Sequence, residues 1–213
     1  MKAYERFLKY VAVWTASDEN SKSVPTTKRQ LDLGALLVEE MKALGLSDVK
    51  MDEYGYVYGY LPATEGMEAV PALGLIAHLD TAPDYNGRDV KPQLIENYDG
   101  KDVELGTSGK VLTVKDFPRL SSYKGRTLIT TDGTSLLGAD DKAGIAEILT
   151  VVEELMQEKT PHGKLCIAFT PDEEQLLEDT TTGFIWCHGC GFSSDSFYSE
   201  EIAAEKWNRR EQE

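Results

Sequence analysis

The chain has 213 residues, of which 37 are acidic and 22 basic, giving a formal net charge of −15. This length can bury a sizeable core in one domain, or in one domain and a fragment, and the acidic balance argues against nucleic acid or an anionic membrane as a partner. Three cysteines, an odd number, do not make a disulfide framework, so we expect a cytoplasmic protein.

Two helices are predicted at the start of the chain. Residues 3–13 carry apolar side chains at helical spacing and read as an amphipathic helix rather than a signal peptide. A polar loop follows, and then a second apolar stripe that ends at Gly45, a plausible helix stop. The members of this second stripe are Leu33, Leu36, Leu37, Met41 and Leu44.

The middle of the chain favours strands. Residues 54–61 alternate with period two, and residues 72–77 form a short apolar run typical of a buried strand. The segment 81–125 is rich in Gly, Asp, Asn and Pro. A connection of that length is usually functional or holds small elements of its own.

A further helix is expected from about Asp140, where apolar side chains recur at helical spacing. Strand signals at 127–130 and 164–170 flank this helix. The order strand, helix, strand indicates an α/β fold with βαβ units. We therefore predict a three-layer architecture, in which a mixed, mainly parallel sheet has helices on both faces.

Acidic and histidine residues follow three of these strands. His78 and Asp80 come after the first, Asp140 and Asp141 after the second, and Glu173-Glu174 after the third. In open α/β sheets, ligands bind outside the carboxyl ends of the strands, so the three clusters are expected to converge. An imidazole with several carboxylates suits a divalent metal, Zn²⁺ foremost, and a spare carboxylate can activate water as a hydrolase requires.

Ordinary structural roles can also explain each cluster. With 37 acidic residues, adjacent carboxylates arise by chance, and a lone His after a strand is often a hydrogen-bonded loop residue. Aspartate is a favoured helix N-cap, which explains one of Asp140 and Asp141 but leaves the other to spare.

Three segments in this order resemble peptidase T, the tripeptide aminopeptidase of the di-zinc exopeptidase clan. They run from His78 to Asp84, from Thr130 to Gly144, and from Ala168 to Glu174, with residues 94–98 between the first two. The resemblance covers residues 1 to about 174. It implies a zinc-exopeptidase catalytic domain that removes the N-terminal residue from tripeptides.

The resemblance also implies roles for individual residues. His78 would bind one zinc, Asp140 would bridge two, and Glu174 would bind the second. Asp80 would accept a hydrogen bond from the other ring nitrogen of His78, which fixes its tautomer. Glu173 would be the general base. The role of Asp141 stays open.

The chain departs from the family after Glu174. Family members continue to another metal-binding aspartate, a lid and dimerisation domain, and a distal histidine ligand. Asp195 lacks the family's context, and no matching distal histidine occurs. We therefore expect residues 1–174 to be the N-terminal part of a catalytic domain and residues 175–213 to be a divergent tail, either frame-shifted or irregular.

Two classes of function are compatible with the sequence. One is an aminopeptidase, or another peptidase or deacylase of the same clan. The other is a catalytically inactive fragment that at most binds metal or a partner. Because two family ligands and the lid are missing, we expect weak zinc binding and hydrolysis near background. A zinc or redox role for the pair Cys187 and Cys190 is disfavoured, because a single C-x-x-C supplies too few ligands.

Overall fold

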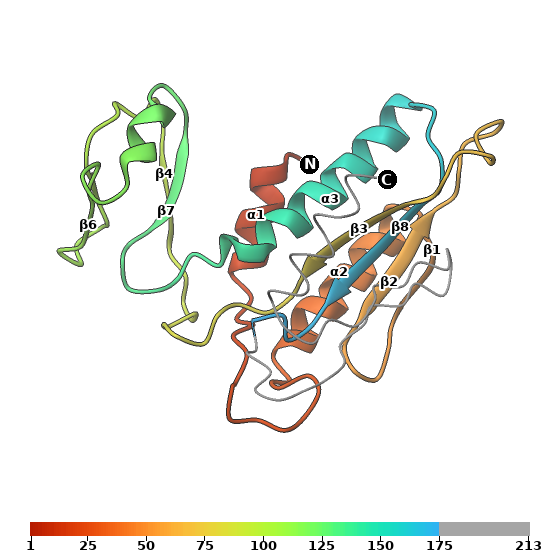
Figure 1. The fold of residues 1–213 in the computed structure, drawn as a ribbon, viewed down its shortest axis with the longest axis horizontal. Coiled ribbons are helices and arrows are strands. Elements are labelled where there is room, and N and C mark those ends of the chain that lie inside the picture. The colour runs from red at the N-terminus through yellow and green to blue at the C-terminus, as the bar shows by residue number, and fades with distance from the viewer. Residues whose placement is uncertain (175–213) are drawn as a thin grey trace, which may run out of the picture. The chain divides into compact units, whose positions relative to one another are not determined.

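A computed structural model of the protein describes residues 1–174, which belong to one compact unit. The expected tail, residues 175–213, lies outside the described residues, and so do Cys187, Cys190 and Asp195. The described chain combines a four-stranded sheet with three α-helices (Figure 1). None of its helices has the length and apolar character needed to cross a membrane.

The first two helices confirm the sequence prediction. Helix α1 spans Ala3–Val11 and α2 spans Gln30–Ala43. After α2, Gly45 adopts a φ of +84°, a left-handed conformation that glycine accepts without strain, so the chain turns sharply there.

The main sheet has the strand order β1-β2-β8-β3. Its strands are β1 (Ser47–Met51), β2 (Val57–Leu61), β3 (Leu73–His78) and β8 (Leu165–Thr170). The strand predicted at 54–61 is thus shorter, and β1 was not predicted. Strands β3 and β8 pair in parallel, as expected, and helix α3 (Ala139–Glu158) lies in the chain between them.

The α/β class and the mixed sheet are confirmed, but two details of the prediction are corrected for residues 1–174. The sheet is not mainly parallel, because β1–β2 and β2–β8 are both antiparallel and only β3–β8 is parallel. The reason is local: β1 and β2 are joined by a short turn at residues 52–56. An antiparallel pair needs no more, whereas a parallel pair needs a long crossover.

The second correction concerns the helical layers. Inward-facing side chains of β2, β3 and β8 belong to one apolar core with α1, α2 and α3, whereas Ile76 on the opposite face is 47% exposed. Helices α1 and α3 run side by side (Figure 1). The three apolar stripes meet on the same face, so within the described range only that face carries helices. The members of this core include Phe7, Tyr10, Leu33, Leu37, Met41, Val57, Leu61, Ala77, Ile145, Leu149, Leu165, Ile167 and Phe169.

Glycine in β2 lets the sheet approach α2 closely. A Cβ placed on Gly59 would lie 2.6 Å from the Met41 side chain and 3.1 Å from that of Val49. Real Cβ atoms do not come within 2.6 Å of another atom, so a larger residue here would require the flexible end of the Met41 side chain to move.

The long segment 81–125 holds small elements of its own. These are β4 (Pro92–Ile95), β5 (Val103–Glu104), β6 (Val111–Leu112) and the 3₁₀-helix η1 (Pro118–Tyr123). Strand β7 (Leu128–Thr131) pairs with β4 and not with the main sheet. The expected βαβ unit from β7 through α3 to β8 is therefore wrong. Strand β4 was not predicted from the sequence. Its Leu94 pairs with Ile129 of β7.

Candidate metal centre

The register of β3 and β8 brings the first and third clusters together. His78 is paired with Thr170, and the Leu79 amide donates to the Thr170 carbonyl oxygen at 2.7 Å. His78 and Asp80 therefore leave the sheet beside the segment that carries Glu173 and Glu174. More than 90 residues separate the two clusters in sequence, but the parallel pairing makes them neighbours.

His78 lies at the centre of the cluster and is 7% exposed. Its Nε2 is 3.0 Å from Oδ1 of Asp140 and 3.7 Å from Oε2 of Glu173. Burial alone would lower the pKa of this imidazole. The hydrogen bonds with Asp80 and Asp140 and the nearby carboxylates outweigh burial and raise the pKa to about 9. The surroundings of the ring thus favour a positive charge at this position.

Asp80 is fully buried and holds the backbone of both glutamates. Its Oδ1 accepts a hydrogen bond from the Glu173 amide at 2.9 Å, and its Oδ2 accepts one from the Glu174 amide at 3.1 Å. The His78 Nδ1 is 3.0 Å from the Asp80 carbonyl oxygen and 3.4 Å from Oδ1. The nearer ring partner is therefore the backbone oxygen, and the carboxylate has a second task that the sequence did not reveal.

Glu173 and Glu174 offer their carboxylates to the same space as His78. One ligand atom from each of these three residues can be chosen so that all lie within 4.8 Å of one another. The pKa of Glu174 is raised by burial and by the charges of Asp140, Asp80 and Glu173, against the opposing effect of His78. Repulsion between the carboxylates is thus only partly relieved by the single imidazole.

The two adjacent aspartates divide between capping and the metal centre. Both have non-helical backbone angles, so the regular part of α3 starts after them. Asp141 accepts a hydrogen bond from the Gly144 amide at 3.1 Å and caps the helix. Asp140, whose side chain is 85% exposed, instead contacts the His78 ring. The sequence predicted this division, in which one aspartate caps the helix and the other carboxylate remains available.

A network that sequence reasoning missed anchors the glutamate segment. Asp172 accepts hydrogen bonds from the Thr26 amide at 2.8 Å and from the buried Gln30 side chain at 2.6 Å. Its own amide donates to the Gln30 side-chain oxygen at 3.1 Å. The start of α2 therefore fixes the residue before Glu173. More than 140 residues separate the partners, and no local pattern marks them.

The donor set fits a divalent metal ion. Four carboxylates, those of Asp80, Asp140, Glu173 and Glu174, surround one imidazole, so the cluster carries excess negative charge. Imidazole and carboxylate are common zinc ligands, with bonds of ~2.0–2.2 Å. Ligand atoms within 4.8 Å need only a small movement to reach one ion.

Sequence comparison supports the resemblance seen in the motifs. The chain is 58% identical over 172 residues to peptidase T of Clostridium acetobutylicum, a match that covers 80% of this chain and 42% of the relative. Peptidase T of Halothermothrix orenii is 54% identical over 175 residues, which cover 81% of this chain and 43% of the relative. The chain thus spans about two fifths of the length of these curated relatives. No family model matches it.

Solved structures show the same fold. Aminopeptidase PepT from Bacillus cereus superposes with a TM-score of 0.55 at 23% identity, over 81% of this chain and 36% of that structure. A tripeptidase from Staphylococcus aureus gives a TM-score of 0.53 at 25% identity, over 85% of this chain and 42% of that structure. The similarity to peptidase T, first seen in three motifs, is confirmed over about four fifths of the chain.

Proposed function

We propose that the chain carries the metal-binding part of an aminopeptidase site that releases the N-terminal residue of tripeptides with the help of two zinc ions. The observation that supports this proposal is that ligand atoms of His78, Glu173 and Glu174 lie within 4.8 Å of one another, and that Asp140 lies 3.0 Å from the same Nε2 of His78 that Glu173 approaches. The identity to peptidase T supports the choice of reaction. The cytoplasm is the compartment we propose for it.

In this proposal His78, Asp140 and Glu174 would hold the metal, and Asp140 would serve both ions. Bound zinc supplies a water molecule of lowered pKa and polarises the peptide carbonyl group. Asp80 keeps both glutamate backbones in place through its two amide hydrogen bonds. It also neighbours the ring of His78, which limits rotation of the imidazole.

Glu173 takes the role of general base in the proposal. Its carboxylate is 63% exposed and lies 3.7 Å from the His78 ring, so it faces the cluster and can also reach a substrate. A proton accepted there can be returned to the leaving amine. Both glutamates contribute to the same group of ligand atoms, so the division of roles between them follows the resemblance.

The second candidate is an inactive fragment that binds metal. The observation in its favour is that the matching region makes up only 42% of the peptidase T relative. Fewer ligands would hold zinc weakly, and an open site would orient a peptide poorly. In that case the cluster binds zinc and no peptide is cleaved.

The test compares zinc content and tripeptide cleavage in three forms of the full chain. We expect slow, zinc-dependent release of the N-terminal amino acid, and a loss of about 10²–10⁴-fold or a fall to background in Glu173→Gln. Zinc content should stay nearly unchanged, because a base and not a ligand is removed. Glu154→Gln, on an exposed position of α3, is the matched control and should cleave like the parent chain.

Each outcome separates the two candidates. If the parent chain cleaves above the zinc-free background and Glu173→Gln retains that rate, the assignment of the base is wrong. If the parent chain binds zinc but cleaves no faster than the zinc-free background, the inactive fragment is the correct description. If no form binds zinc, the metal centre itself is refuted.

A further inference from the structure

One stretch of chain contacts all three segments that carry the candidate metal ligands. This stretch, residues 13–30, runs from just after α1 to the first residue of α2, and we call it the α1–α2 connection. None of its residues contributes an atom to the group of ligand atoms around His78. Any effect that it has on the metal centre must therefore pass through the residues next to the ligands.

The first contact is with the start of α3. Lys142 lies two residues after Asp140 and is buried, and its Nζ donates to the Val13 carbonyl oxygen at 2.6 Å. No carboxylate among residues 1–174 forms an ion pair with this amine. A buried ammonium group without a carboxylate is costly, so the hydrogen bond to Val13 is the interaction that offsets this cost. It ties the chain just beyond Asp140 to the α1–α2 connection.

The second contact is with the end of β3. Ala16 forms a parallel bridge with Thr81, and the Ser17 amide donates to the Thr81 carbonyl oxygen at 3.2 Å. Thr81 is buried and directly follows Asp80. The α1–α2 connection thus fixes the backbone immediately after the residues His78 and Asp80.

The third contact is with the residue before Glu173. The buried side chain of Gln30 binds Asp172 at two points, because its Nε2 donates to Oδ1 at 2.6 Å and its Oε1 accepts from the amide at 3.1 Å. Asp172 has a φ of +58°, in the left-handed region that residues other than glycine rarely adopt. Such a conformation persists only where the surroundings determine it, and the hydrogen bonds from Gln30 and Thr26 do so here.

With this contact, every amide of the glutamate segment has a side-chain acceptor. The amide of Asp172 donates to Gln30, and the amides of Glu173 and Glu174 donate to Asp80. Both acceptor side chains are buried. Two side chains therefore set the backbone from which the glutamate carboxylates project.

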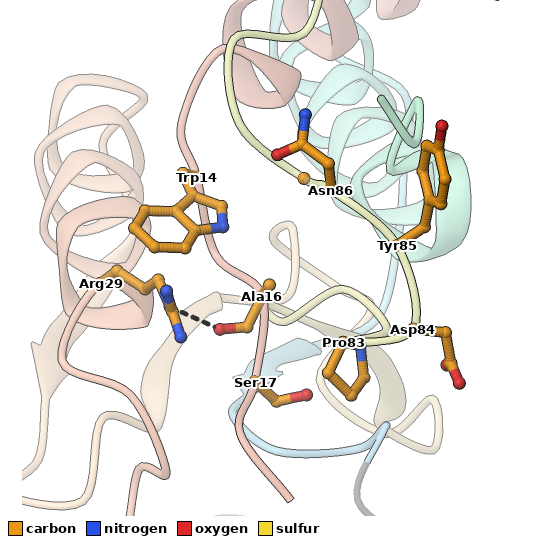
Figure 2. Close-up of a pocket in the computed structure, with 9 residues that line it drawn as sticks. Trp14, Ala16, Ser17, Arg29, Pro83, Asp84, Tyr85 and Asn86 are labelled. Atoms are coloured by element: carbon orange, nitrogen blue, oxygen red, sulfur yellow. Dashed lines mark hydrogen bonds between the residues drawn. The ribbon is translucent and has the colours of Figure 1, made fainter. Parts of the chain in front are cut away.

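The α1–α2 connection is also closed on itself. Figure 2 shows that Arg29 donates through Nε to the Ala16 carbonyl oxygen, at 2.6 Å, and the Thr27 hydroxyl donates to the same oxygen at 2.9 Å. These bonds join the part of the connection that contacts Asp172 to the part that contacts Thr81. The contacts with β3 and with the glutamate segment therefore belong to one frame.

We propose that the α1–α2 connection positions the ligands of the metal centre and that Gln30 is its principal positioning residue. The inference rests on the proposed function, because it takes Glu173 and Glu174 to serve a bound zinc ion. Gln30 acts through the backbone of Asp172 and touches neither metal nor peptide. Residues that orient ligands typically contribute about 10–100-fold to metal affinity. Because Gln30 is uncharged, its removal leaves the charge of the cluster unchanged.

The competing explanation is purely structural: Gln30 only stabilises the start of α2. In that case its loss lowers the melting temperature, but the folded chain binds zinc as before. Positioning instead predicts a weaker zinc complex and a local loosening of the two glutamates. The two explanations thus differ in measurements that a general loss of stability does not reproduce.

The experiment measures the zinc dissociation constant of the full chain by isothermal titration calorimetry, and the hydrogen exchange of its amides by NMR without zinc. Gln30→Met keeps a similar side-chain volume and removes both hydrogen bonds to Asp172. We expect this variant to bind zinc about tenfold more weakly. Its Glu173 and Glu174 amides should exchange about tenfold faster relative to the Ile167 amide in the centre of β8, because only local opening becomes easier.

Two further variants test the cause. The paired exchange Gln30→Glu/Asp172→Asn swaps the carboxylate and the amide, so that both hydrogen bonds can form again with the charge on the other partner. It should recover most of the zinc affinity that Gln30→Met loses. Lys28→Met, at an exposed position of the same connection, is the matched control and should keep the parent values.

The outcomes separate this inference from the proposed function. An unchanged zinc dissociation constant in Gln30→Met would overturn the inference, even if the melting temperature fell. Equal acceleration of exchange at Glu173 and Ile167 would also overturn it, and failure of the paired exchange to recover zinc binding would exclude the bonds to Asp172 as the cause. If the parent chain binds no zinc, the proposed function fails, whereas locally faster exchange in Gln30→Met would still establish that Gln30 orders the glutamate backbone.

Discussion

Two charged clusters in this molecule are built from similar residues but differ in their charge balance. In the first, Arg6 bonds Glu40 at 2.7 Å and Glu153 at 2.8 Å, and the N-terminal amine and Lys9 pair with the same two carboxylates. Three cations thus face two anions. In the second, the single imidazole of His78 faces the carboxylates of the metal centre.

The difference indicates which cluster is complete. The Arg6 cluster joins α1 to α2 and α3, its arginine is 1% exposed, and the Thr150 hydroxyl accepts a further hydrogen bond from it at 3.0 Å. Each charge has a partner within the chain, so the cluster needs nothing from outside. The carboxylates around His78 outnumber the cation beside them, and a positive ligand would complete that cluster. The first cluster is therefore a structural contact between helices, and the charge balance of the second supports our proposal that it binds a metal ion.

The largest effect is expected when the complete cluster is broken. Arg6→Ala should lower the free energy of unfolding by about 3–5 kcal/mol, because it leaves two partly buried carboxylates without their main partner. Urea unfolding followed by circular dichroism measures the change.

Lys9→Ala is the matched control for this substitution. Lys9 pairs with Glu40 from an exposed position, so its loss should cost no more than about 1 kcal/mol. If both variants lose equally little, burial does not distinguish the two cations, and the contact contributes less than its geometry implies.

The second effect comes from completing the other cluster. Zinc at a hundred times its dissociation constant should raise the free energy of unfolding by about 2.7 kcal/mol, provided that it binds only the folded chain. His78→Ala should abolish this gain. Arg6→Ala should keep it, although its starting stability is lower. Equal stabilisation of the His78 variant by zinc would place the ion elsewhere.

Part of the fold and of the candidate site could be predicted from the sequence. The apolar stripe of α2 and the strand at 164–170 are local patterns, and they marked α2 and β8 well. The three clusters were expected to converge because strands deliver their ends to one edge, and His78, Asp140 and Glu174 do meet. Local patterns were thus sufficient to predict α2 and β8. The convergence of the site residues could be predicted because β3 and β8 pair in parallel.

Long-range pairing was harder to predict from the sequence. The strand at Leu128–Thr131 was recognised, but its partner Pro92–Ile95 was hidden in a polar segment, so β7 was assigned to the wrong sheet. Similarly, Arg6 has the spacing of a solvent-facing residue in an amphipathic helix, and only the packing of α1 against α3 reveals its burial. In both cases a partner distant in sequence decides the outcome.

The smallest effect is expected in the pH dependence, where the two clusters should respond to acid in opposite directions. Burial would raise the pKa of Glu40, but hydrogen bonds from Arg6 and Lys9 outweigh burial and lower the pKa below 4.5. This glutamate therefore stabilises the fold above that value, and the contribution is lost as the pH falls through its folded pKa. Burial and neighbouring carboxylates instead raise the pKa of Glu174 above 4.5. In the zinc-free chain, its contribution makes the fold less stable as the pH rises from 4.5 through the raised value.

Urea unfolding of the zinc-free chain between about pH 3 and pH 7 tests this opposition. Glu40→Gln should be less stable than the parent at neutral pH and should lose less of its stability in acid. Glu174→Gln should be more stable than the parent at neutral pH, because one of the repelling charges is gone, and the two should converge at low pH. Zinc should reverse the second comparison, since the variant lacks a ligand that the parent uses. If neutralising Glu174 destabilised the zinc-free chain, the carboxylates around His78 would be satisfied without a metal, and the contrast between the clusters would fail.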